Sequence, residues 1–260
     1  PSIMIAQMYH VHTKKGILKG YIGALPPHLK QKQVTEFDHL LVDIGATSKE
    51  EAIALGVSLG DIVTFVPVYE TLTNHRVLAK SVDNRYGVGL ALEMMAILHD
   101  VDLPYNLAIG ATVQEEVGLR GAETSVNLIQ PDIFIALDAS PVSDLSKGSD
   151  IALGKGFLLR MYDPRNTMPE YLKKAITTLA DANGIPYQHY ISKGGTDAAK
   201  AKDMLAGVVN TTIGLPARYI HGPAAIFDTR DLDAARNMLQ TLLQTLTEAH
   251  IQKLKKGAFD

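Results

Sequence analysis

Hydrophobic positions divide the chain into two parts that differ in their periodicity. Residues 1–77 hold short segments in which apolar and polar residues alternate, separated by glycine, proline and charged turns. Four such segments occupy 5–14, 16–24, 39–46 and 61–69. A period of two is typical of strands with one buried face, and short strands at this spacing predict a small β-barrel or sandwich. One short helix is expected at 48–55.

From about residue 78, amphipathic helical patterns alternate with short apolar runs. The predicted helices are 84–99, 120–128, 169–183, 196–204 and 229–256. The predicted strands are 107–113, 133–137, 153–162, 187–192 and 208–213. Strands that alternate with helices of this length predict a layered α/β domain. We therefore expect a small β domain at 1–77 and an α/β domain at 78–260.

Composition narrows the classes of function. With 46% hydrophobic and 20% charged residues and a net charge of -3, the 260 residues predict a soluble chain. No charge run indicates a nucleic-acid or membrane partner, no apolar stretch is long enough for a bilayer, and no signal peptide is visible. A cytoplasmic protein is expected. Because the chain has no cysteine, a bound metal must be held by His, Asp and Glu, which suits a catalytic site with an open position.

Two adjacent carboxylates, Glu115 and Glu116, follow the apolar run NLAIGATV. They stand at the predicted end of the strand 107–113, in the segment QEEVGLRGA. Adjacent residues of an extended segment point to opposite sides, so one carboxylate can face a metal while the other faces substrate or water. A Glu-Glu pair alone is more often a charged loop that caps a strand. Other residues must therefore support a site.

Three further residues have ordinary explanations when each is taken alone. Asp83 precedes NRYG, where a helix begins, and would serve as its N-cap. Asp138 follows a predicted strand, where aspartate is usually a turn former. His221 lies in a loop after the strand 208–213. The segment GGTDA then opens a helix, with Thr196 as a cap and two glycines that allow close approach of the backbone.

Taken together, these residues predict a metal site. In open α/β sheets, functional groups gather beyond the carboxyl ends of the strands, where Glu115, Glu116 and Asp138 are expected. Three carboxylates that converge without a cation repel one another, which raises their pKa values. Divalent ions remove that repulsion. A set of Asp, Glu and His is typical of a hydrolase with two metal ions.

Five motifs carry a specific resemblance. SVDNRYG, QEEVGLRGA, ALDAS, KGGTDA and RYIH, in this order and at these spacings, resemble the co-catalytic metallo-aminopeptidases that include glutamyl aminopeptidase and the tetrahedral aminopeptidases. PPHL at 26–29 and DIGATSKEEA from Asp43 resemble the β-rich domain inserted into that family's catalytic domain. The resemblance covers essentially the whole chain. It implies an α/β/α sandwich with an inserted small β-barrel domain, and hydrolysis of N-terminal residues from peptides.

The resemblance also implies a role for each site residue. Asp83 matches the carboxylate that bridges two metals, Glu116 a ligand of one metal, and Asp138 and His221 ligands of the other. Glu115 matches the general base that takes a proton from the attacking water and passes it to the leaving amine. Two divalent ions are expected, zinc or cobalt ahead of manganese, although His and carboxylate ligands suit all three.

One family ligand has no counterpart in the sequence. It is a histidine in a His-x-Asp motif upstream of the inserted β domain, and the sequence begins without that motif and without an initiator methionine. If the protein starts there, we expect weak metal binding and little activity. His10 and His12 share a face of a predicted strand. Their alternation with Tyr9, Val11 and Thr13 favours an interpretation as surface residues.

Two cations flank the acidic motifs. Lys193 precedes Gly194, Gly195 and Thr196, and Arg218 lies three residues before His221. Surface cations usually serve solubility. The resemblance to glutamyl aminopeptidase favours a substrate-binding role, in which Lys193 pairs with the side-chain carboxylate of an N-terminal Glu or Asp. Arg218 either binds substrate as well or positions the loop that carries His221.

Two alternatives to the aminopeptidase stay open. One is another dinuclear amidohydrolase, such as a deacylase or a carboxypeptidase-like enzyme. The other is a truncated, inactive structural subunit. Peptides are the expected substrates, and a homo-oligomer is expected because family members often form tetrahedral dodecamers, although the sequence does not fix the number of subunits.

Overall fold

The computed structural model describes residues 1–24, 28 and 36–257. They divide into two compact units, Pro1–Tyr69 with Gly222–Ala224, and Glu70–His221 with Ala225–Asp260. The division therefore falls earlier than the 77/78 boundary suggested by composition. The physical reason is β5 (Arg76–Ala79), which pairs antiparallel with β11 (Ala225–Asp228) in the sheet of the second unit.

The first unit contains a three-stranded antiparallel sheet. Its strands are β1 (Gln7–Thr13), β2 (Gly16–Ile22) and β3 (Ile62–Phe65), in the order β2-β1-β3, and its helices are η1 (Ser2–Met4), η2 (Phe37–His39) and α1 (Lys49–Ala54). Tyr9 and Val11 are buried, whereas His12 is exposed and lies 3.0 Å from the hydroxyl of Thr64. The alternation that placed His12 on the surface is confirmed.

The predicted strand at 39–46 is wrong. This segment meets the sheet only through an isolated bridge between Tyr21 and Asp43. In the described part of the first unit, β1 lies between β2 and β3. Of the PPHL motif, all but His28 lies outside the described residues. Alternation alone predicted a strand here, but a strand also needs a partner for its backbone groups.

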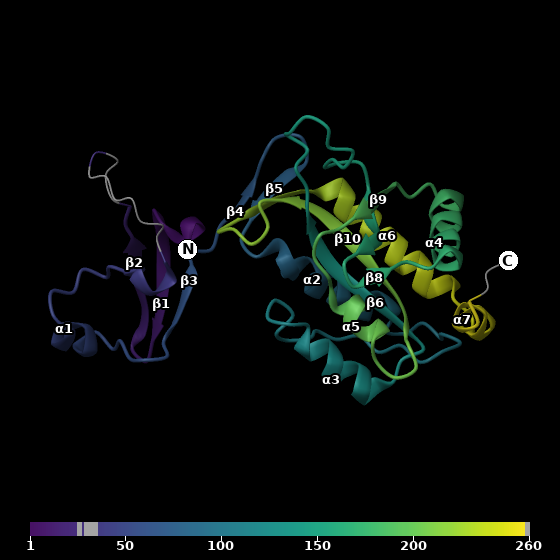
Figure 1. Ribbon diagram of the computed structural model, residues 1–260, viewed down its shortest axis with the longest axis horizontal. Coiled ribbons are helices and arrows are strands. Elements are labelled where there is room, and N and C mark those ends of the chain that lie inside the picture. Colours follow the sequence, from purple (N-terminus) through teal and green to yellow (C-terminus); the bar gives the residue numbers. More distant parts are fainter. Residues whose placement is uncertain (25–27, 29–35, 258–260) are drawn as a thin grey trace. The chain divides into compact units, whose positions relative to one another are not determined.

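The second unit is built on a mixed sheet (Figure 1). Its order is β4-β5-β11-β10-β7-β8, with β6 paired to β10 and β9 paired to β7. The further strands are β4 (Tyr69–Thr71), β6 (Ile133–Pro141), β7 (Phe157–Asp163), β8 (Asn166–Thr167), β9 (Tyr187–Ile191) and β10 (Val209–Arg218). The helices are α2 (Val82–Leu98), α3 (Arg120–Ile129), α4 (Glu170–Ala182), α5 (Asp197–Lys202), α6 (Thr229–Thr245) and α7 (Glu248–Lys255).

Helices cover both faces of this sheet. One face packs Phe157 and Leu159 of β7 into a core with apolar residues of α2, α4 and α6. On the other face, Val126 of α3 and Ala201 of α5 pack with Phe134 of β6. Successive strand residues point to opposite faces, and both faces of β7 and β10 are largely buried. The predicted α/β/α sandwich is confirmed.

The predicted helix 229–256 is two helices. Leu246 is extended, with ψ 135°, and the side chain of Thr247 accepts a hydrogen bond of 3.2 Å from the His250 amide. Thr247 is therefore the N-cap of α7. The apolar pattern runs across the break, so periodicity did not reveal it. No helix in the described ranges has the length and apolar character needed to cross a bilayer.

The segment 107–113 is not a strand, although its apolar run predicted one. Leu107 and Ile109 pack against the core of the second unit, but within the described residues no ladder forms along the segment. Conversely, β6 continues past Leu137 to Pro141, so Asp138 lies within the strand, opposite Gly214 of β10. The strand predicted at 153–162 begins only at Phe157.

Candidate metal centre

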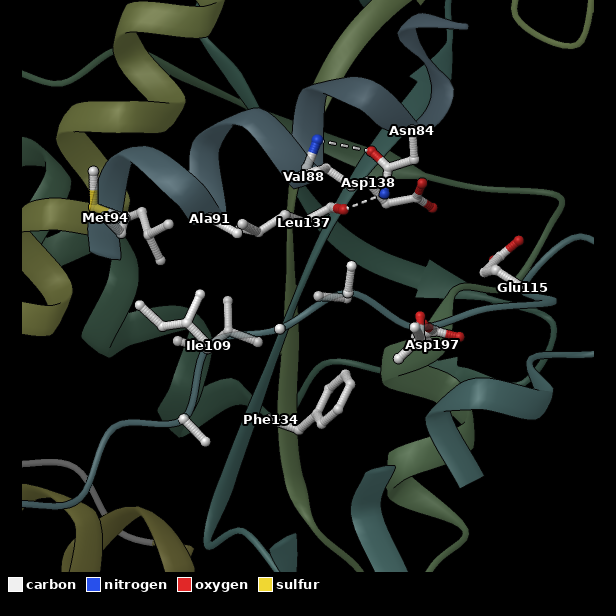
Figure 2. Close-up of a pocket in the computed structure, with 18 of the residues that line it drawn as sticks. Asn84, Val88, Ala91, Met94, Ile109, Glu115, Phe134, Leu137, Asp138 and Asp197 are labelled. Atoms are coloured by element: carbon white, nitrogen blue, oxygen red, sulfur yellow. Dashed lines mark hydrogen bonds between the residues drawn. The ribbon is translucent and has the colours of Figure 1, made fainter. Parts of the chain in front are cut away.

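Asp83 stands at the start of α2 but does not cap it. The side-chain oxygen of Asn84 accepts a hydrogen bond of 2.9 Å from the Gly87 amide, and the Asn84 amide donates one of 2.7 Å to the Leu137 carbonyl. Asn84 thus caps the helix and ties it to β6 (Figure 2). Gly87 makes this approach possible, since a Cβ there would lie 2.4 Å from the Leu137 carbonyl oxygen. The Asp83 carboxylate is left free to face the site.

The turn that carries Glu115 and Glu116 folds back on α3. The Gly121 amide donates to the Val113 carbonyl and the Leu119 amide to the Glu115 carbonyl, both at 2.9 Å. A Cβ at Gly121 would lie 2.4 Å from the Val113 oxygen, so only glycine allows this contact. The first turn of α3 therefore fixes where the two glutamates leave the backbone.

Asp83, Glu116 and His221 converge. The Nε2 atom of His221 lies 3.1 Å from a carboxylate oxygen of Asp83 and 3.4 Å from one of Glu116. One ligand atom from each residue lies within 4.8 Å of the others. The Asp83 side chain is 13% exposed, whereas those of His221 and Glu116 are 63% and 61% exposed, so the cluster is open on one side. Three protein ligands with an open side are typical of a catalytic zinc site.

Asp138 lies next to this cluster in a low-dielectric environment. Its side chain is 15% exposed, and burial, followed by the charge of Asp83, raises its pKa to about 8. Burial and the charge of Glu116 raise the pKa of Asp83 as well, against a lowering by His221. Carboxylates that converge without a cation behave in this way. The oxygen and nitrogen ligand atoms fit a divalent cation, and so does the repulsion between the carboxylates.

Unlike Glu116, Glu115 lies outside the cluster with Asp83 and His221, although both glutamates line the same cavity. It lines a cavity of about 390 Å³ between α2, β6 and the segment 107–112, and Figure 2 shows its carboxylate at the same end of that cavity as those of Asp138 and Asp197. Burial, and then the charge of Asp197, raise the pKa of Glu115 to about 7. A general base works best when its pKa is near the operating pH. The geometry thus separates a candidate ligand from a candidate base.

A family of known proteins matches most of the chain. Residues 1–238 match the family model described as M42 glutamyl aminopeptidase. The chain belongs to this family. It is therefore an aminopeptidase of the M42 group, a metallopeptidase family that uses divalent metal.

Individual relatives cover nearly the whole M42 chain. Glutamyl aminopeptidase of Lactococcus lactis subsp. cremoris is 35% identical over 98% of this chain and 74% of its own length. Lysyl aminopeptidase of Pyrococcus furiosus is 32% identical over 95% of this chain and 72% of its own. The solved TET1 peptidase of Pyrococcus horikoshii, which can assemble into a tetrahedron or a large octahedral shell, is 33% identical, with a TM-score of 0.84 over 94% of this chain and 73% of that one.

The arrangement of ligands in this M42 chain differs from the one expected from the sequence. We expected His221 to share a metal with Asp138, but the structure brings His221 to Glu116 and Asp83. β10 ends at Arg218, and the following turn places Tyr219 and His221 in the left-handed region, with φ of 64° and 62°. Such conformations cost about 1–3 kcal/mol each and gather at functional sites.

The loop between β9 and α5 contributes fewer substrate-facing groups than expected. Lys193 and Gly194 are exposed and Gly195 is half-buried. Thr196, however, is 1% exposed, and its hydroxyl lies 3.0 Å from that of Thr212 in β10. Thr196 begins α5 without a side-chain capping bond. The side chain of Thr196 therefore anchors the start of α5 inside the fold.

The guanidinium of Arg218 also forms an ion pair within the protein. Its guanidinium donates to both carboxylate oxygens of Asp144, at 2.6 and 2.8 Å, and lowers the pKa of that carboxyl. Asp144 in turn accepts a hydrogen bond of 3.1 Å from the Leu153 amide. This bidentate pair fixes the end of β10. The structure favours the alternative in which Arg218 positions the loop that carries His221.

Sequence reasoning did not assign three residues that shape the site. Asn84 and Asp197 lie within quoted motifs, but only their neighbours were given roles. Arg160 was missed entirely, although an arginine inside the apolar run GFLLRMY signals a buried, paired charge. It is 7% exposed and donates to the Gly194 carbonyl and to the Ser140 hydroxyl, both at 2.8 Å. Arg160 therefore joins the loop between β9 and α5 to β6.

Proposed function

We propose that this protein removes single residues from the free N-termini of peptides, with Glu115 as the general base. Asp83 would bridge two divalent ions, Glu116 and His221 would hold one of them, and Asp138 would hold the other. The observation that carries the proposal is the position of Glu115. It lies beside the cluster without joining it, and its pKa is raised to about 7.

The residues of the chain divide the reaction between them. When bound, the ions would supply Lewis acidity toward the peptide carbonyl. Glu115 takes the proton of the attacking water and returns it to the leaving amine, which a carboxylate outside the ligand set can do. Asn84 and Gly87 hold Asp83 against β6, and Arg160 holds the loop at Gly194. These hydrogen bonds hold Asp83 and the loop at Gly194 in fixed positions relative to the sheet.

An assay of matched peptides tests the activity. We expect hydrolysis of peptides with a free α-amine and none of the same peptides with an acetylated N-terminus, measured by release of the first residue. Preferential cleavage of acylated substrates would instead favour the alternative, a dinuclear deacylase. Cleavage from the carboxyl end would favour a carboxypeptidase-like enzyme.

We further propose a preference for acidic N-terminal residues. The relatives differ in the charge that their names imply, glutamyl at 35% identity and lysyl at 32%, so membership of the family does not decide the preference. The support within this chain is Lys193, an exposed cation in the loop directly before Gly194 and α5. An ammonium group there complements the side-chain carboxylate of a substrate.

Replacement of Lys193 tests this preference. We expect Lys193→Gln to lower kcat/KM for Glu-terminated peptides by roughly fivefold relative to Leu-terminated ones, since a solvent-accessible ion pair contributes up to about 1 kcal/mol. Lys174→Gln, at an exposed position of α4, is the matched control and should leave the ratio unchanged. An unaltered ratio in the Lys193 variant would assign substrate preference to another residue.

Assembly into a homo-oligomer is supported by the solved P. horikoshii relative, which forms closed shells. Exposed apolar side chains on the first unit, among them Ile17, Leu59 and Ile62, also favour contact with another subunit. The number of subunits, the cytoplasmic location and the choice of metal stay predictions.

A further inference from the structure

The segment that presents Glu115 is held in an unusual way. Residues 107–113 form no helix, and their backbone forms no ladder with any strand in the described part of the chain. Leu107 and Ile109 anchor one side by packing on the core. Thr112, three residues before Glu115, provides a polar anchor through a hydrogen bond from its hydroxyl to the carboxylate of Asp197.

Asp197 is itself fixed to the central strands. It is the first residue of α5, directly after Thr196, whose hydroxyl pairs with that of Thr212 in β10. Three residues before Asp197, the Gly194 carbonyl accepts the hydrogen bond from Arg160 of β7. The Thr112 hydroxyl is therefore tied to a loop that two buried strands hold in place.

Asp197 and Glu115 share one environment. Both line the same cavity, and Figure 2 shows the two carboxylates near one another at its polar end. The Oδ1 atom of Asp197 is buried and has no hydrogen-bond partner among the described residues. Loss of the Thr112 hydroxyl would leave this carboxylate with neither of its oxygens bonded among the described residues. The backbone bonds from the first turn of α3 to the Val113 and Glu115 carbonyls would remain, but the side-chain anchor on the approach to Glu115 would be lost.

We infer that Thr112 and Asp197 are positioning residues, whose hydrogen bond sets the place of Glu115 relative to the Asp83, Glu116 and His221 cluster. The inference rests on the proposed role of Glu115 as the general base. A catalytic group that is misplaced by about 1 Å can cost as much as a hundredfold in rate, even when binding is intact. The two residues act through Glu115 and need not touch the substrate.

A pair of substitutions at Thr112 tests the inference. Valine matches threonine in shape but lacks the hydroxyl, so Thr112→Val should lower kcat about tenfold or more and leave KM and metal content within about twofold, as expected for a group that acts only in the transition state. Thr112→Ser keeps the hydroxyl and should restore kcat to within about threefold of the original. A merely structural role would lower the melting temperature and metal content together with kcat.

Two comparisons make the result decisive. Thr211→Val removes another buried threonine hydroxyl, one with no hydrogen-bond partner among the described residues, and should leave kcat unchanged. Asp197→Ala breaks the bond from its other end. If the two residues work as a unit, the double variant Thr112→Val with Asp197→Ala should lose no more kcat than the more damaged single variant.

The outcomes separate this inference from the function on which it rests. Full kcat in Thr112→Val, failure of Thr112→Ser to restore kcat, or additive losses in the double variant would each overturn the positioning role while Glu115→Gln remains inactive. If Glu115→Gln itself retains activity, the proposed base is wrong, and the positioning role falls with it.

Discussion

Glu115→Gln should lower kcat about a hundredfold to ten-thousandfold, the range that general acid-base catalysis contributes. Glutamine has nearly the same shape but cannot accept the proton of the attacking water. Glu115 is not part of the cluster formed by Asp83, Glu116 and His221, so metal content and KM should stay close to those of the unaltered protein. Steady-state kinetics on a free-amine peptide and metal analysis of the same preparation measure both quantities.

The matched control is Glu123→Gln. Glu123 lies on α3, shortly after the same turn, and its half-exposed carboxylate pairs with Lys200 at 2.7 Å. Activity should be unchanged in this variant, because a surface pair of this kind contributes little to stability. Loss of bound metal in Glu115→Gln would make Glu115 a ligand instead of a base. Retained activity would remove it from the chemistry.

The elements that the sequence predicted well are those whose pattern and partners agree locally. α2, α3 and α4 lie within a residue or two of the predicted ranges because their apolar stripes repeat at helical spacing. The segment 107–113 shows the limit. Its apolar run predicted a strand, but a ladder depends on residues distant in sequence, which no local pattern contains.

Prediction of the site from the sequence has the same limit, because contacts between side chains also depend on residues distant in sequence. Residue types at predicted strand ends and loops suggested Asp83, Glu116 and His221 as candidate ligands, and the family resemblance implied the role of each. The structure brings these three side chains together. The commitment of Arg218 to Asp144 could not be read from the sequence, because the two residues meet only through the folding of β10 against the loop after β6. The N-cap of α2 was predicted one residue too early. Asn84, and not Asp83, caps this helix, because both residues can accept a hydrogen bond there and the sequence does not show which one does.

Asp83→Asn should have the largest effect on the metal centre. Asp83 contacts His221 and interacts electrostatically with both Glu116 and Asp138, so it links the two candidate ligand groups. An amide of the same shape carries no charge to bridge two cations. We expect more than about a hundredfold loss of activity, because removal of even an outer partner of a metal ligand costs 10–100-fold. Asp100→Asn, with a side chain 96% exposed just after α2, is the matched control.

The pH dependence of stability in the metal-free protein is a second measurement that reports on the same carboxylates. The pKa of Asp138 is raised from 3.8 to about 8 in the folded chain, by burial first and the charge of Asp83 second. Between these pH values the folded state binds more protons than the unfolded state, so stability falls as the pH rises from about 4 to about 8. Added divalent metal should reverse this fall, because it binds the ionised carboxylates of the folded state.

Asp83→Asn should change this dependence in a defined direction. Without the Asp83 charge, ionisation of Asp138 costs less, so the decrease in melting temperature between pH 5 and pH 8, measured with chelator present, should become smaller. It should not vanish, because burial of Asp138 is the larger cause and persists. The rescue by added metal should be lost, since Glu116 and His221 can no longer share a bridging carboxylate with Asp138. A variant that still binds two ions per chain would contradict the assignment of Asp83 as the bridge. A metal-free protein that gains stability with rising pH would instead contradict the raised pKa of Asp138.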